Sequence, residues 1–218
     1  MKEDGKRIGF LFDLDGVIID SESEYSRIWH QINLEYPTGI ENLEQVIKGC
    51  TLSKILNENF KTDEIRAKVS RRLHELEDQM HYEYLPFARE FLKELKERQL
   101  PCVLVTSSDT QKMNHLREEI GELEEFFDHI ITGDLVKTSK PSPEGYILGA
   151  SKLNIDPLNC VVFEDSLQGV MAGQNAGSYV VGIAGTLPAE KIEPYSNIVI
   201  NNFNELDLEN LIQELKNR

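Results

Sequence analysis

The sequence predicts an α/β protein in which helices cover a parallel sheet and an all-helical segment is inserted after the first strand. Short runs rich in β-branched and aromatic residues alternate with segments of helical periodicity, and this alternation is typical of a parallel sheet wrapped by helices. Between about residues 21 and 84 the helical periodicity continues without any strand-like run. We therefore expect one sheet-containing core and one helical insert.

Six runs are expected to form strands. In chain order they are IGFLFD (8–13), CVLVTS (102–107), HIIT (129–132), CVVFED (160–165), YVVGIAG (179–185) and the weaker NIVIN (197–201). The helices between and after them place apolar residues at helical spacing, namely Phe87, Phe91, Leu92 and Leu95, then Met113, Leu116 and Ile120, and finally Leu208, Leu211, Ile212 and Leu215. Another helix is expected to start near Ser142 and Pro143. Ser108, with Gln111 three residues later, has the spacing of a capping box at a helix start.

The inserted segment carries three apolar faces at helical spacing. They are Tyr25, Ile28, Trp29 and Ile32; Leu43, Val46, Ile47 and Cys50; and Ile65, Val69, Leu73, Leu76 and Met80. Ser21 followed by Glu24 has the capping-box spacing and is expected to cap the first of these helices. The insert therefore begins directly after the first strand.

Composition and charge narrow the class of protein. The chain has 218 residues, enough for a large domain or for a core with a smaller insert. The net charge of −15 argues against nucleic acid or an anionic membrane as partner. No apolar run approaches the roughly 20 residues that span a bilayer. Three widely spaced cysteines and no signal-peptide pattern predict reduced thiols and a cytoplasmic protein.

Chemically useful side chains follow the predicted strands at the points where the strands end. Ligands of open α/β sheets gather at the carboxyl ends of the strands. Two aspartates at one strand end could equally well cap the following turn, but here hydroxyls, a lysine and further carboxylates reach the same edge. The residues expected there are Asp13, Asp15, Thr106, Ser107, Lys140, Glu164 and Asp165.

This combination suits a magnesium ion and a phosphoryl group. Mg²⁺ takes one or two carboxylates together with phosphate and water, and Asp13 and Asp165 can supply the carboxylates. The ion would also relieve the repulsion between Asp13 and Asp15, which are two positions apart on a strand. We expect Asp13 to attack phosphorus as nucleophile and Asp15 to act as general acid and base.

The remaining residues of this edge would hold the substrate. Thr106, the backbone around Ser107 and the ammonium of Lys140 can stabilise the charged oxygens of a phosphoryl group during transfer. An acidic chain needs such local positive charge or a metal to bind a phosphorylated substrate.

Four motifs, in order, resemble those of the haloacid dehalogenase-like hydrolases. They are DLDGV after the first strand, VLVTSS, the lysine of SKPSPE, and FEDSLQGVMAG. The resemblance spans nearly the whole chain and is nearest to the beta-phosphoglucomutase-like branch. It implies Asp13 as nucleophile, Asp15 as acid and base, and Mg²⁺ held by Asp13, the backbone carbonyl of Asp15 and Asp165, with Glu164 close by.

The resemblance also implies a domain organisation. The fold of this branch is a doubly wound core with a helical cap between the first strand and its helix. We expect residues 1–20 and 86–218 to form the core domain and residues 21–85 to form the cap domain.

Several activities within the family are open. Haloacid dehalogenases proper attack carbon and do not need the second aspartate, so Asp15 favours phosphoryl transfer. Beta-phosphoglucomutases carry a histidine on the first cap helix and an arginine after a lysine–glycine pair. Here Lys48 and Gly49 are kept, but Tyr25 and Leu52 stand at the other two positions. Without a bidentate phosphate anchor a phosphatase is favoured over a mutase.

Two further alternatives were weighed. Lys48 could form the Schiff base of a phosphonoacetaldehyde hydrolase, although nothing in the sequence marks its pKa as lowered. A catalytically silent metabolite-binding regulator would usually lose the nucleophile or the acid and base, whereas Asp13 and Asp15 are both present. The expected function is a Mg²⁺-dependent phosphatase of a small phosphorylated metabolite, such as a sugar phosphate. Tyr25, Lys48 and Leu52 are the cap residues expected to contact the substrate.

Overall fold

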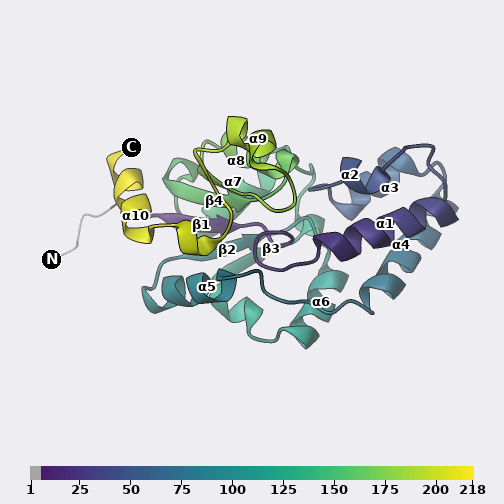
Figure 1. The fold of residues 1–218 in the computed structure, drawn as a ribbon, viewed down its shortest axis with the longest axis horizontal. Coiled ribbons are helices and arrows are strands. Elements are labelled where there is room, and N and C mark those ends of the chain that lie inside the picture. The colour runs from purple at the N-terminus through teal and green to yellow at the C-terminus, as the bar shows by residue number, and fades with distance from the viewer. Residues whose placement is uncertain (1–5) are drawn as a thin grey trace.

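A computed structural model describes residues 6–218 as a parallel sheet flanked by helices, with a helical lobe at one end (Figure 1). Residues 1–5, which belong to the expected core domain, lie outside the described part. The strands are β1 (Gly9–Phe12), β2 (Cys102–Val105), β3 (His129–Ile131), β4 (Cys160–Glu164), β5 (Tyr179–Ile183) and β6 (Ile198–Ile200). All six predicted strands are present.

The order of the strands places the site. The sheet runs β3-β2-β1-β4-β5-β6 and every neighbouring pair is parallel. Chain order therefore reverses direction between β1 and β4, which is the position where open α/β sheets bind ligands. The Asp13 amide extends the pairing by donating to the Phe163 carbonyl at 3.0 Å. The first residues after β1 are thus fixed beside the end of β4.

Helices cover both faces of the sheet, so the expected doubly wound core is confirmed. The core helices are α5 (Ala88–Glu97), α6 (Thr110–Glu119), α7 (Glu144–Leu153), α8 (Leu167–Asn175), α9 (Ala189–Ile192) and α10 (Leu208–Asn217). One face packs aromatic side chains: the Phe12 and Phe163 rings stack at 4.5 Å, and the Phe91 and Phe203 rings stack at 4.8 Å. The other face packs on α7 and α8 through Leu11, Val103 and Val162 among others.

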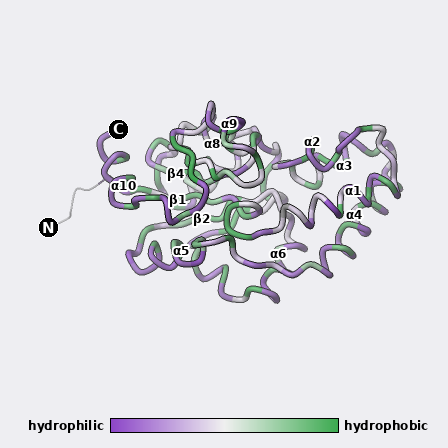
Figure 2. The backbone as a smooth tube through the Cα atoms, in the orientation of Figure 1, coloured by the Kyte–Doolittle hydropathy of each residue, from purple (hydrophilic) through white to green (hydrophobic). Residues whose placement is uncertain are grey.

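Hydropathy follows this layering. Figure 2 shows hydrophobic residues concentrated in the strands, whereas the outer helices alternate between hydrophobic and hydrophilic residues. The two cysteines at strand starts, Cys102 and Cys160, are buried, as expected for core thiols. No helix in residues 6–218 is long and apolar enough to cross a membrane.

The helical lobe consists of four helices rather than the expected three. They are α1 (Glu22–Glu35), α2 (Leu43–Val46), α3 (Leu52–Asn59) and α4 (Asp63–Glu77). Helix α3 was not predicted, and its start is capped by the Thr51 hydroxyl, which accepts from the Lys54 amide. The second predicted apolar face forms only the four-residue helix α2, and the chain turns at Gly49, where φ is +73°.

Two apolar residues that were predicted to face inward are exposed. Val46 ends the short helix α2 and is 58% exposed. Phe87 precedes α5 in a left-handed conformation with φ 66° and is 47% exposed. In both cases the helix is shorter than the apolar spacing predicted, so the residue leaves the buried face.

The two predicted capping boxes were wrong. The Ser21 hydroxyl makes no cap hydrogen bond and donates instead to Asp15. Ser108 also donates to Asp15, at 3.1 Å, and Asp109 caps α6 by accepting from the Lys112 amide. The Asp15 carboxylate competes with the helix ends for both hydroxyls.

Short 3₁₀ turns complete the loops. They are η1 (Leu123–Phe126), η2 (Gly133–Leu135), η3 (Pro157–Asn159), η4 (Glu193–Tyr195) and η5 (Phe203–Glu205). The chain enters and leaves the helical lobe through two adjacent segments. Ile19 and Tyr84 form an antiparallel bridge, the Asp20 amide donates to Glu83, and the Leu85 amide donates to Ile18.

Candidate active site

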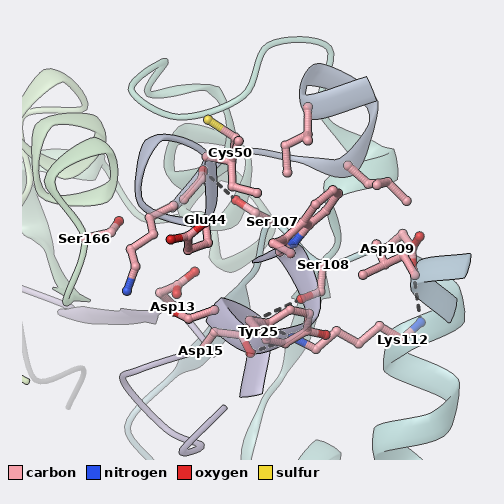
Figure 3. Close-up of a pocket in the computed structure, with 18 of the residues that line it drawn as sticks. Asp13, Asp15, Tyr25, Glu44, Cys50, Ser107, Ser108, Asp109, Lys112 and Ser166 are labelled. Atoms are coloured by element: carbon pink, nitrogen blue, oxygen red, sulfur yellow. Dashed lines mark hydrogen bonds and ion pairs between the residues drawn. The ribbon is translucent and has the colours of Figure 1, made fainter. Parts of the chain in front are cut away.

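Three buried carboxylates meet where β1 and β4 end. Asp13 follows β1, Glu164 ends β4 and Asp165 follows it, and one oxygen from each lies within 4.8 Å of the others. Figure 3 shows Asp13 beside Asp15 at the base of a pocket whose opposite side is formed by the helical lobe. The structure thus brings together the residues that the sequence analysis placed at different strand ends.

Lys140 binds two of these carboxylates. Its ammonium lies 2.6 Å from Asp13 Oδ1 and 2.5 Å from Glu164 Oε1. Burial opposes the charge of Lys140, but the two carboxylates outweigh burial and raise the pKa of this lysine. Glu164 is fully buried and also accepts from the Tyr146 hydroxyl at 2.7 Å. Glu164 therefore fixes Lys140 so that its ammonium reaches Asp13.

Asp13 is held in an unfavourable environment for a negative charge. Burial, with smaller contributions from the Glu164 and Asp15 carboxylates, outweighs the opposing effect of Lys140 and raises the pKa of Asp13 to about 7. A divalent cation among the carboxylates of Asp13, Glu164 and Asp165 would favour the ionised form. The donor set of hard carboxylate oxygens fits Mg²⁺.

Asp15 lies beside these three carboxylates, and both of its own carboxylate oxygens accept hydrogen bonds. Lys112, from α6, donates to both of its oxygens at 2.6 Å, and the hydroxyls of Ser21 and Ser108 also donate to it. Burial alone would raise the pKa of Asp15, but Lys112 and the two hydroxyls lower it below its ordinary value. Asp15 is therefore ionised in this arrangement.

Thr106 and Ser107 follow β2 as predicted, but their hydroxyls have other partners. The Thr106 hydroxyl accepts from the Ser108 amide at 3.0 Å and is buried beside Lys140 in a small neighbouring cavity. The Ser107 hydroxyl donates to the Gly49 carbonyl of the helical lobe at 3.0 Å. Ser107 lines the same pocket as Asp13 and Asp15.

The pocket between the sheet edge and the helical lobe has a volume of about 120 Å³. Tyr25, Lys48 and Leu52, the predicted substrate-contacting residues, all line it. The Tyr25 hydroxyl donates to Glu77 at 2.7 Å, and the Lys112 ammonium lies 4.2 Å from the centre of the Tyr25 ring. The lobe therefore presents aromatic, aliphatic and acidic groups and one lysine, Lys48, to the pocket.

Several site residues were not found from the sequence. Lys112 and Glu77 sit on amphipathic helices and are separated by 97 and 62 positions from Asp15, so no local spacing signalled them. Glu44 was not singled out either. Ser166, which also lines the pocket, caps α8 by accepting from the Gly169 amide.

Two glycines are required by close approach to the acidic group. Gly16 has φ +73°, and a Cβ there would lie 2.0 Å from Asp165 Oδ2. A Cβ at Gly169 would lie 1.8 Å from the Glu164 carboxyl carbon. Gly173, four residues later, instead allows α8 to pack closely on Val162 and Val180.

Comparisons with known proteins agree with this geometry. The haloacid dehalogenase-like hydrolase family model matches residues 9–177. A phosphorylated carbohydrates phosphatase of Thermotoga maritima is 34% identical over 77% of this chain and 80% of its own. Hexitol phosphatase A of Escherichia coli is 32% identical over 80% of this chain and 82% of its own.

A comparison with solved structures finds the same fold. A beta-phosphoglucomutase from Clostridium difficile superposes with a TM-score of 0.79 and 26% identity, covering 97% of both chains. The family match spans β1 to the end of α8 and therefore includes the predicted residues of the acidic group and Lys140. The chain belongs to the haloacid dehalogenase-like hydrolase family.

Proposed function

We propose that the protein is a Mg²⁺-dependent phosphatase that hydrolyses a small phosphorylated metabolite of the sugar phosphate class. The observation that carries this proposal is Asp13, bound by Lys140 within the carboxylate group and open to the pocket. The named activities of the Thermotoga and Escherichia relatives, which are phosphatases of carbohydrate and hexitol phosphates, support the same class.

The chain's own residues account for both halves of the reaction. Asp13 attacks phosphorus, the bond from phosphorus to the leaving oxygen breaks, and an aspartyl phosphate forms. Asp15 hands a proton to the leaving alcohol and afterwards accepts one from the water that hydrolyses the aspartyl phosphate. Asp15 is ionised in this structure and must take up a proton before it can donate one. We therefore expect its hydrogen bonds from Lys112 to rearrange when the substrate binds.

The positive groups of the site act on the transferring phosphoryl oxygens. Lys140 lies 2.6 Å from the nucleophile, so its ammonium can neutralise charge that develops on a phosphoryl group bound there. Backbone groups around Ser107 and the buried Thr106 hydroxyl complete this side. Asp13, the Asp15 carbonyl and Asp165, with Glu164 nearby, would hold Mg²⁺, which supplies electrostatic stabilisation of the phosphoryl charge.

The helical lobe would act as a cap. We divide the chain into a core of residues 1–20 and 86–218 and a cap of residues 21–85. Lys48 is a cation on the cap side of the pocket, but Tyr25 and Leu52 offer no guanidinium that could bind a second phosphate through two hydrogen bonds, whereas a mutase must hold both phosphates of a bisphosphate intermediate. This composition favours hydrolysis over the mutase reaction.

Phosphate release by the purified protein tests the proposal. A panel of sugar phosphates and other phosphomonoesters is assayed with Mg²⁺ and after chelation, and beta-glucose 1-phosphate is also followed for glucose 6-phosphate. Asp13→Asn should lower turnover by about 10³-fold or more, because it removes the nucleophile. Asp63→Asn is the matched control, since the Asp63 side chain is 97% exposed on α4.

Each alternative has its own outcome. Formation of glucose 6-phosphate without phosphate release would replace the phosphatase with a mutase. Ligand binding without turnover, unchanged in Asp13→Asn, would indicate a catalytically silent binding protein.

A further inference from the structure

Glu44 brings an unsatisfied carboxylate oxygen to the pocket. This residue lies in α2 on the cap side, and Figure 3 shows it among the pocket residues near Asp13. Its Oε2 atom is buried and has no hydrogen-bond partner among residues 6–218. A buried polar atom without a partner is destabilising and rare in folded proteins, so its presence in a pocket points to a role there. The phosphoryl chemistry described above does not use it.

The surroundings of Glu44 define what it can bind. Trp29, Ile47 and Leu52 contribute an apolar wall to the same pocket. Glu77 contributes a second acidic group, but its carboxylate already accepts from the Tyr25 hydroxyl. Glu44 Oε2 is therefore a cap-side acceptor that is available to a donor on the substrate.

We propose that Glu44 determines substrate specificity by accepting a hydrogen bond from a hydroxyl of the leaving group. The inference rests on the proposed phosphatase function and narrows its substrates to phosphomonoesters of hydroxylated carbon chains. A site that is built to bind a hydroxyl rejects analogues that lack it, because the buried acceptor is then left unpaired. The apolar wall packs against the carbon atoms of the same chain.

The charge of Glu44 has a second consequence. A substrate that carries another phosphate on its leaving group would place that anion on the cap side, near the carboxylate of Glu44, in a pocket that the ammonium groups of Lys48 and Lys112 also line. Repulsion between the second phosphate and the Glu44 carboxylate opposes the attraction of these lysines. Glu44 thus lowers the activity on bisphosphates relative to that on polyol and sugar monophosphates.

A pair of esters that differ only in hydroxyl groups tests the hydrogen bond. The ratio of kcat/KM for glycerol 1-phosphate to that for n-propyl phosphate is measured for wild type, Glu44→Ala and Glu44→Gln. We expect wild type to prefer the glycerol ester by about 10- to 100-fold and Glu44→Ala to lose most of this preference. Glu44→Gln keeps an acceptor oxygen and should retain part of it.

The matched control and the charge test use the same design. Glu41→Ala removes an exposed glutamate just before α2 and should keep the wild-type ratio.

The ratio of activity on fructose 1,6-bisphosphate to that on fructose 6-phosphate should rise about threefold or more in Glu44→Gln, because the amide removes the repelling charge.

Binding measurements separate this inference from the proposed function. The affinities of glycerol 1-phosphate and n-propyl phosphate are measured by calorimetry in the Asp13→Asn background, with and without Glu44→Ala. A hydroxyl preference that disappears with Glu44→Ala supports the role of Glu44 even if no ester is turned over, in which case only the phosphatase proposal fails. A hydroxyl preference that is absent when Glu44 is present, or that survives in Glu44→Ala, overturns the role of Glu44.

Discussion

Asp15 shows how one carboxylate can organise residues from distant parts of the chain. Its oxygens accept from Lys112, Ser21 and Ser108, which come from α6 and from the residues just before α1 and α6. The sequence showed that Asp15 is chemically important but not which groups bind it. Both serines had plausible local roles as helix caps, and only the folded chain shows that a buried anion outcompetes those roles.

The Lys112–Asp15 pair should be important for stability. Lys112→Met keeps the aliphatic volume but leaves Asp15 without its cation, and the loss of one partner of a buried pair is expected to lower the free energy of unfolding by about 3 kcal/mol or more. Urea denaturation at neutral pH measures this. Lys96→Met is the control, because Lys96 pairs with Glu125 at the surface and its loss should change stability by under about 1 kcal/mol. Equal effects of the two substitutions would contradict the prediction.

Glu77 should make stability depend on pH. Burial raises the pKa of Glu77 above its ordinary value of 4.5, against the opposing effects of Lys112 and Tyr25. The folded state therefore keeps this proton longer than the unfolded state, and the stability it contributes is lost as pH rises through the raised pKa. Glu77→Gln removes this loss, so its free energy of unfolding relative to wild type should increase as pH rises above 4.5 and through the raised pKa of Glu77.

The matched substitution for this experiment is Glu75→Gln on the same helix. The Glu75 side chain is 52% exposed, so its difference from wild type should stay nearly constant over the same pH range. A flat difference for Glu77→Gln, measured by urea denaturation at each pH, would show that burial does not govern its titration.

Helix α8 packs closely on the end of β4 because Gly169 has no side chain. Gly169→Ala would place a Cβ 1.8 Å from the Glu164 carboxyl carbon, so helix and carboxylate cannot keep their positions. We expect this substitution to lower the free energy of unfolding by about 3 kcal/mol and to reduce activity, because Glu164 orients Lys140. Gly121→Ala is the control, since its Cβ would meet nothing closer than 3.6 Å. Similar melting temperatures for the two variants would contradict this account.

The strands could be predicted from sequence more completely than the cap helices. Each strand is a short apolar run between turns, and the parallel arrangement then brings Asp13 and Glu164 to one edge without further information. Helix α3 lacks so clear a pattern, and its start depends on the Thr51 cap. The four-residue helix α2 shows the opposite case, in which an apolar spacing continues beyond the end of the helix. Glu44 lies on that helix, and its access to the pocket depends on how the cap packs.

Hydrogen bonds join the cap to the core, and we expect ligand binding to favour the closed arrangement in which they are made. Ser107 donates to Gly49 at 3.0 Å, and His74 Nε2 lies 2.9 Å from Asp109 Oδ2. Ser107 thereby joins the sheet edge that we propose binds phosphate to the helical lobe that we propose acts as a cap. We expect Mg²⁺ with beryllium fluoride, a phosphate mimic for aspartates, to increase the population with these contacts made, and small-angle scattering to report a more compact particle.

Asp13→Asn provides the control for this measurement. It removes the carboxylate to which we expect the mimic to bind, so the scattering profile of this variant should not respond. Identical profiles of the wild-type protein with and without the mimic would count against cap closure.

The paired segments at Ile19 and Tyr84 have an evolutionary consequence. The chain leaves the core and returns to it at adjacent positions joined by a backbone bridge, so the intervening residues can be exchanged without altering the strands on either side. Asp13 and Asp165 belong to the part that would remain, whereas Glu44 and Leu52 belong to the part that would be replaced. A lineage with this architecture can change its substrate specificity by replacing the helical lobe while its reaction chemistry is inherited unchanged.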